Sequence, residues 1–93
     1  MSDQHVYKNV TQTVFTCVKA KSKAEHGTDY EPHNANSGTA VTKVTFVGTI
    51  KIDFSFNPAA NTLTYSNLQK PSIVPESSVW NGIEATIKEC GGG

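Results

Sequence analysis

Residues 42–56, TKVTFVGTIKIDFSF, decide the fold class, because apolar and polar side chains alternate along them. Strict alternation is typical of a β-strand with one buried face, since successive side chains of a strand point to opposite sides. The even-numbered positions hold the apolar residues Val44, Phe46, Ile50, Ile52, Phe54 and Phe56. The odd-numbered positions are polar apart from Val47, which predicts an antiparallel sheet with one face in the core and the other in water.

Gly48 lies inside this run and does not change its parity. A two-residue turn at 48–49 would place core residues opposite exposed ones, so it is disfavoured. Two arrangements remain: a three-residue loop, Val47-Gly48-Thr49, or one long strand bent at Gly48. We favour the bent strand, because glycine inside a strand often marks a bulge or a bend.

The C-terminal half of the chain predicts a hairpin and a helix. A loop of residues 57–62, with Pro58 presetting a turn, pairs Phe56 with Leu63 and Phe54 with Tyr65. Residues 70–75 contain two prolines and predict an extended connector. A helix follows, capped by Ser77 or Ser78 and by Gly91, with these apolar residues at helical spacing: Val79, Trp80, Ile83, Ile87 and Cys90.

Period and composition disagree in the N-terminal half. An i, i+4 stripe that includes Val10, Val14 and Val18 suits a helix, but residues 11–18 are rich in β-formers. The alternating lysines at 19, 21 and 23 favour a strand over residues 11–21, where they would protect an exposed edge. Residues 22–40 are polar and rich in Gly, Pro and Asn, which predicts a long loop.

We therefore predict one α+β domain over residues 1–93. Its curved antiparallel sheet has three or four strands, and the C-terminal amphipathic helix packs on one face of that sheet. Residues 91–93, all glycine, predict a flexible tail.

The charge balance argues against an anionic partner. The 93 residues carry no net charge, and all eight basic residues are lysine. Arginine is the preferred residue for bidentate contacts to phosphate and guanine, so we expect no nucleic acid. No apolar run is long enough to cross a membrane, and we expect no membrane partner. The N-terminus resembles no secretory signal, which predicts a cytoplasmic protein; secretion is the alternative if a signal was removed.

Two cysteines and one group of possible metal ligands are the residues with potential redox, catalytic or metal-binding roles. Cys17 and Cys90 form no C-x-x-C pair, and we interpret them as two buried thiols, with a disulfide as the alternative. The possible metal ligands are His26, Asp29, Glu31 and His33, whose spacing matches no established signature. We interpret these four as solvated loop residues and predict no metal, no cofactor and no catalytic residue.

The functional hypothesis is a non-catalytic binding or self-assembly module. In the preferred version the outer face of the sheet carries the apolar residues Tyr7, Phe15 and Val47 and pairs with a second copy or a protein partner. In the alternative version an apolar small molecule binds between sheet and helix, in a pocket lined by Phe46, Ile52, Phe54, Tyr65 and Trp80. A small enzyme with an unrecognised site is the third hypothesis.

Overall fold

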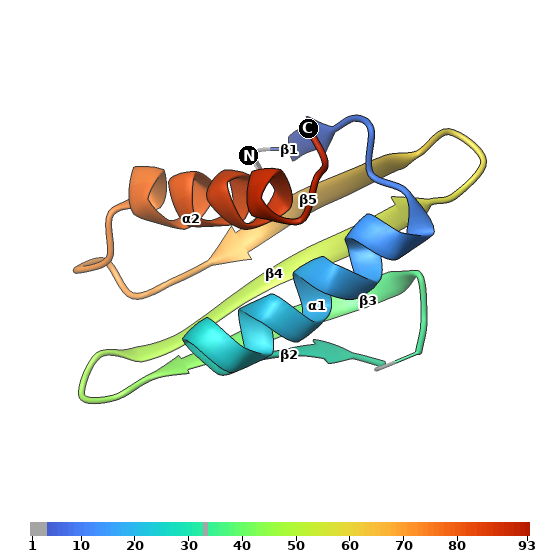
Figure 1. Cartoon of the computed structure of the whole chain (residues 1–93). Coiled ribbons are helices and arrows are strands. Elements are labelled where there is room, and N and C mark those ends of the chain that lie inside the picture. The colour runs from blue at the N-terminus through green and yellow to red at the C-terminus, as the bar shows by residue number, and fades with distance from the viewer. Residues whose placement is uncertain (1–3, 33) are drawn as a thin grey trace.

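The elements follow one another as β1, α1, β2, β3, β4, β5 and α2 (Figure 1). The computed structural model describes residues 4–32 and 34–93. Within these residues the elements are β1 (Gln4–Tyr7), α1 (Gln12–His26), β2 (Thr28–Glu31), β3 (Ser37–Val44), β4 (Gly48–Asn57), β5 (Thr62–Gln69) and α2 (Glu76–Glu89).

One antiparallel sheet has the strand order β1-β5-β4-β3-β2, and both helices lie on the same face of it (Figure 1). We call the face toward the helices the inner face and the opposite one the outer face. The prediction of an α+β fold with an antiparallel sheet is confirmed. The sheet has five strands in the described residues and not three or four, because β1 and β2 arise from segments that the sequence did not mark as strands.

The hairpin of β4 and β5 has the register that the alternation predicts. Phe56 pairs with Leu63, and Phe54 pairs with Tyr65. The Asn57 side chain accepts hydrogen bonds from the backbone N–H groups of Ala59 and Ala60, at 3.1 and 3.2 Å, and so closes the turn.

The prediction of one strand bent at Gly48 is wrong. Residues 45–47 form a turn, and β3 and β4 are paired so that Val44 faces Gly48 and Thr42 faces Ile50. Even positions still lie opposite even positions, as the alternation predicts, because the turn has three residues. The turn comes two residues earlier than in the loop considered above, and this places Phe46 at its tip and not in the core.

The prediction of a strand over residues 11–21 is also wrong, because these residues belong to α1. Thr11 caps the helix by accepting a hydrogen bond from the N–H of Val14 at 3.3 Å, and Gly27 ends it with a left-handed φ of 68°. The buried stripe of α1 consists of Val14, Phe15, Val18 and Ser22. Burial of this stripe on the sheet outweighs the β-propensity of the individual residues.

The lysines of α1 do not protect a sheet edge. Lys19 places its Nζ 4.5 Å from the centre of the Phe15 ring. Lys21 pairs with Glu25 at 3.3 Å and with Glu89 of α2 at 3.0 Å, and Lys23 pairs with Asp29 at 2.7 Å. The long loop predicted for residues 22–40 is wrong in turn, since it contains the end of α1, all of β2 and the start of β3.

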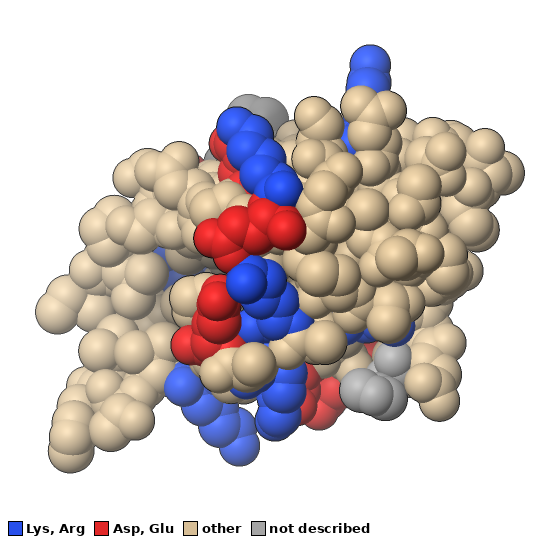
Figure 2. Space-filling view, viewed as in Figure 1, with Lys and Arg blue, Asp and Glu red and all other residues tan. Residues whose placement is uncertain are grey.

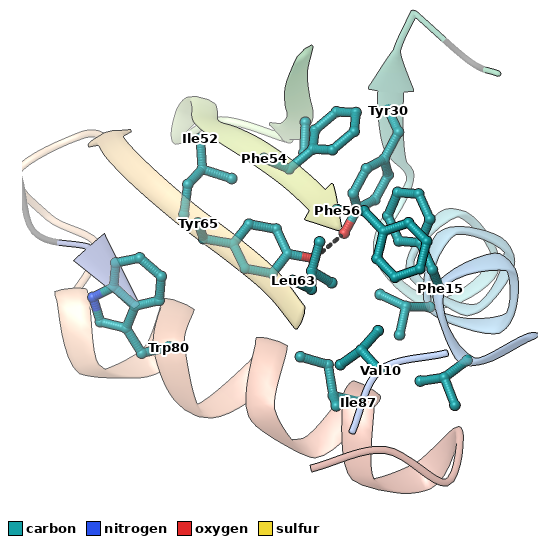
Figure 3. Packing of buried hydrophobic residues seen from close by; sticks show 13 residues of the cluster. Val10, Phe15, Tyr30, Ile52, Phe54, Phe56, Leu63, Tyr65, Trp80 and Ile87 are labelled. Atoms are coloured by element: carbon teal, nitrogen blue, oxygen red, sulfur yellow. Dashed lines mark hydrogen bonds between the residues drawn. The ribbon is translucent and has the colours of Figure 1, made fainter. Parts of the chain in front are cut away.

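Phe15 of α1 is fully buried in the hydrophobic core (Figure 3). The centre of its ring lies 4.5 Å from that of Phe56, 6.0 Å from that of Phe54 and 6.3 Å from that of Tyr30. Trp80 and Ile87 of α2 belong to the same cluster. Burial of Ile52, Phe54 and Phe56 confirms the prediction that the even positions of β4 face the core.

A disulfide joins Cys17 of α1 to Cys90 at the end of α2, with a Cα–Cα distance of 5.8 Å. The interpretation as two free thiols is therefore wrong: both cysteines are half-buried and face each other across the two helices. The glycine tail is hydrogen-bonded, although the sequence predicts a flexible one. The N–H of Gly92 donates to Ile87 O at 2.9 Å, and the N–H of Gly93 donates to Lys8 O at 3.1 Å.

α2 begins at Glu76, slightly ahead of the predicted serine caps, and no side chain caps its first turn. Of the two helices in the described residues, neither is long and apolar enough to cross a membrane.

Candidate functional site

A cavity of about 470 Å³ lies between α1, α2 and the inner face of the sheet. Its wall includes Ser22 and His26 from the C-terminal half of α1 and Val79 and Ile83 from α2. Tyr65 of β5 and residues of β2, β3 and β4 complete it. The cavity is therefore built from segments that are far apart in the sequence.

The two helices are tied together near the C-terminal end of α2, and the cavity lies beside residues 78–86 of that helix. The Cys17–Cys90 disulfide and the ion pair of Lys21 with Glu89 join the middle of α1 to the end of α2. The wall includes small residues from α1, β3 and α2, namely Ser22, Ala40, Ser78 and Gly82.

Gly82 makes the clearest contribution to this space. It lies inside α2, where glycine costs about 0.5–1 kcal/mol relative to alanine. A Cβ atom added to it would meet no atom within 4 Å. Packing therefore does not require glycine at this position, and the cavity remains open beside it.

The wall of the cavity is mostly apolar. Its aliphatic residues are Ala40, Val44, Ile50, Ile52, Val74, Val79 and Ile83. Several polar side chains in the wall already have protein partners: the hydroxyls of Thr28 and Thr42 bond each other at 2.6 Å, and that of Thr86 donates to Gly82 O at 2.9 Å. These hydroxyls need no partner from a ligand.

Two tyrosine hydroxyls meet on the sheet side of the cavity (Figure 3). Tyr30 and Tyr65 are hydrogen-bonded at 2.7 Å, and Ser22 bonds Tyr30 from α1. Burial raises the pKa of Tyr30 and raises that of Tyr65 still further, so both groups stay neutral. Three hydroxyls carry three protons and the two bonds between them use two, so the cluster can donate one further hydrogen bond.

Two of the five residues predicted to line a pocket do so, Ile52 and Tyr65. Phe54 is buried deeper in the core, with its ring centre 4.9 Å from that of Tyr30. Trp80 stacks on His5 with ring centres 3.7 Å apart, and its Nε1 is buried without a hydrogen-bond partner among the described residues. Phe46 projects from the β3–β4 turn and is fully exposed, so its assignment to the core side is wrong.

The residues predicted to form an interface do not share one surface. Phe15 is fully buried in α1, so its predicted place on the outer face of the sheet is wrong. The error follows from the prediction of a strand over residues 11–21. Tyr7 packs against the core from β1, with its ring edge-on to Tyr65. Val47 is exposed in the β3–β4 turn.

Of the four residues considered as metal ligands, the three that the structure describes form no metal-binding group. Asp29 accepts a hydrogen bond from Lys23, and His33 lies outside the described residues. Over residues 4–32 and 34–93, no three side chains of His, Cys, Asp or Glu form a group that could hold a metal ion.

Sequence reasoning missed most of the cavity wall, including Ser22, Ala40, Val79 and Ile83. The only local signal was Gly82, a glycine in the middle of a clear amphipathic helix. Comparisons with protein-family models, with curated proteins and with solved structures find no match to this chain. The cavity is therefore the feature from which a function can be inferred.

Proposed function

We propose that the protein is a non-catalytic binding module that holds an apolar small molecule between α1, α2 and the sheet. The observation that carries this proposal is the cavity of about 470 Å³ with its mainly aliphatic wall. Small-molecule sites typically have volumes of roughly 300–1,000 Å³ and a few well-placed polar groups. The self-assembly hypothesis loses support because Phe15 and Tyr7 pack into the core.

The chemistry of the wall defines the class of ligand. No acidic residue lines the cavity in the described part of the chain, and the tyrosine–serine cluster offers one hydrogen-bond donor. The basic residues of the wall are His26 and Lys43. A cationic group would lose its hydration without gaining an opposite charge, which is costly. The mainly aliphatic wall favours an uncharged ligand over an anionic one. The ligand we propose is uncharged and mostly apolar, with one acceptor such as a carbonyl or ether oxygen.

Substitutions of Gly82 test the site, with fluorescence of the apolar dye N-phenyl-1-naphthylamine as the readout. Gly82→Phe places a ring in the open space beside α2 and should weaken dye binding at least tenfold. Gly82→Ala is the matched control. Its affinity for the dye should lie within about twofold of that of the unmodified protein, and its free energy of unfolding should be about 0.5–1 kcal/mol higher. Circular dichroism establishes that both variants are folded.

The charge of the probe tests the ligand class. 8-Anilinonaphthalene-1-sulfonate differs from the first dye only by its sulfonate group, and it should bind at least tenfold more weakly. Absence of 1:1 binding of the uncharged dye, or equal binding to the Gly82→Phe variant, would refute the proposal.

The disulfide bears on where this binding takes place. Structural disulfides persist in oxidising compartments and are rare in the cytoplasm, so we infer the secreted alternative and not the cytoplasmic one. Protein isolated from its native cells and alkylated in denaturant without reductant should gain no mass, whereas addition of two alkyl groups would point to the cytoplasm.

A further inference from the structure

Three large apolar side chains are exposed at the end of the molecule where the helices are not tied together. Phe46 and Val47 lie in the β3–β4 turn and Ile73 in the β5–α2 loop, with exposed fractions of 105%, 37% and 75%. We call these three residues the apolar tip. Figure 1 shows both segments at the same end of the sheet.

The two segments of the apolar tip are in contact and border the cavity. A Cβ atom added to Gly48, just after the β3–β4 turn, would lie 2.9 Å from Cγ of Pro71, just before Ile73. Thr45 and Val74, the neighbours of Phe46 and Ile73, line the cavity. An apolar molecule that reaches the tip is therefore next to the cavity wall.

The conformation of Phe46 has no explanation inside the chain. Its φ is +64°, in the left-handed region that bulky residues rarely occupy. Asn or Gly would fit this turn with less strain, and the exposed ring gains no buried contact in return. Strain and exposure at one residue indicate a role outside the fold.

Lysines flank the apolar tip. Lys51 of β4 lies opposite Gln69 of β5 in the sheet, and Gln69 precedes Lys70 in the sequence. Lys43 of β3 lies opposite Thr49 of β4, two positions before Lys51. In the described residues, these three lysines form no ion pair. Glu76, in the first turn of α2, is the acidic residue nearest to the tip in sequence.

Charge is arranged differently over the helices. Figure 2 shows acidic and basic side chains alternating in a band there, whereas the hairpin that projects at the lower left ends in uncharged surface. The band corresponds to ion pairs such as those of Lys21 with Glu89 and Lys88 with Glu84. Lys8 also forms no ion pair in the described residues, but it stands alone, so the lysines beside the tip are the cluster left to attract an anionic partner.

We propose that the apolar tip docks on the surface of a lipid bilayer that contains anionic lipids, and that the apolar ligand passes between bilayer and cavity at this end. The second part rests on the proposed function. A few apolar side chains with flanking lysines are enough for reversible attachment to such a surface. A stable protein interface buries more than about 1,000 Å², which three side chains do not supply. This surface contact revises the expectation from the sequence that no membrane takes part.

Flotation with vesicles tests the docking, using phosphatidylcholine alone or with 30 mol% phosphatidylserine. The unmodified protein should float with the anionic vesicles. Phe46→Asn, which suits the left-handed φ, combined with Ile73→Ser should lower the partition coefficient at least tenfold. Val6→Ser is the matched control. Val6 is half-exposed in β1 and pairs with Thr64 near the start of β5, at the end of that strand away from the apolar tip. This variant should change the partition coefficient less than twofold.

The lysines are tested in the same assay. Lys43→Gln, Lys51→Gln and Lys70→Gln should each lower partition about fivefold, the equivalent of about 1 kcal/mol per lysine near an anionic surface. Lys8→Gln is the control, since Lys8 follows β1 at the opposite end of the molecule and is exposed. Equal losses for Lys8 and for the three tip lysines would overturn the assignment of the docking surface.

The outcomes separate the two proposals. Gly82→Phe should float as well as the unmodified protein, because the tip is intact. Dye binding without flotation would refute the docking and leave the proposed function standing. Flotation without dye binding would refute the proposed function and leave the docking standing. A dimer in sedimentation equilibrium that Phe46→Asn converts to a 10.0 kDa monomer would show that a second copy covers the tip, and the docking would be wrong.

Discussion

Removing the bond between Cys17 and Cys90 should lower the free energy of unfolding by about 4 kcal/mol. The bond joins residues 73 positions apart. Closing a loop of this length removes about 15 cal/mol/K of entropy from the unfolded chain, which corresponds to about 4 kcal/mol at 25 °C. For a domain of this size, the same loss lowers the melting temperature by about 20 °C.

Urea titration of the Cys17→Ala/Cys90→Ala variant measures the loss, with the fluorescence of the buried Trp80 as the probe. Both cysteines are half-buried, so the alanines remove little other packing. Dithiothreitol provides the control: it should move the midpoint of the unmodified protein to that of the variant and leave the variant unchanged. Equal midpoints for the two proteins without reductant would refute the reasoning and restore the interpretation as free thiols.

Two other predictions concern the core. Phe54→Ala should lower the free energy of unfolding, measured by urea titration, by about 3–5 kcal/mol, because Phe54 is buried against Tyr30 and Phe15. Ser55→Ala, at the exposed neighbouring position, should change it by less than about 0.5 kcal/mol. Equal losses for the two variants would contradict the assignment of Phe54 to the buried face. The contribution of Tyr30 and Tyr65 to stability should be complete below pH 10, the ordinary pKa of tyrosine. Above pH 10 it should fall by about 1.4 kcal/mol per pH unit for each of them, because burial raises their pKa in the folded protein and only the unfolded chain readily loses these protons. Absorbance at 295 nm should show the two phenolates forming together with unfolding, and their ionisation in the folded protein would contradict the prediction.

The part of the fold that follows from the sequence is the part decided by local alternation. The register of the β4–β5 hairpin could be predicted, because Phe54 and Phe56 must meet apolar partners across the turn, although the loop is shorter than predicted, since Asn57 pairs with Thr62. α1 could not be predicted from composition, since its threonines and valines favour strands. Its helical signals were the stripe of Val14 and Val18 and the Gly27 cap, and contact with the sheet makes these decisive.

The candidate site could not be predicted because its wall is defined by side chains that are too small to fill the space. Ser22, Ala40 and Gly82 lie on three different elements, and none of them is unusual in its own segment. Phe46 could not be placed correctly either, although its side chain is large. Its even position marks it as core, and only the exact place of the reversal, at residues 45–47, puts it in solvent.

The pairing of β1 with β5 has a consequence for synthesis of the chain on the ribosome. His5 pairs with Tyr65, so β1 has no partner strand until some sixty more residues have been made. Strands β2 to β5 follow one another in the sheet and can pair in the order in which they emerge. β1 is therefore the last strand to join, and until it does the long edge of β5 is open to other nascent chains.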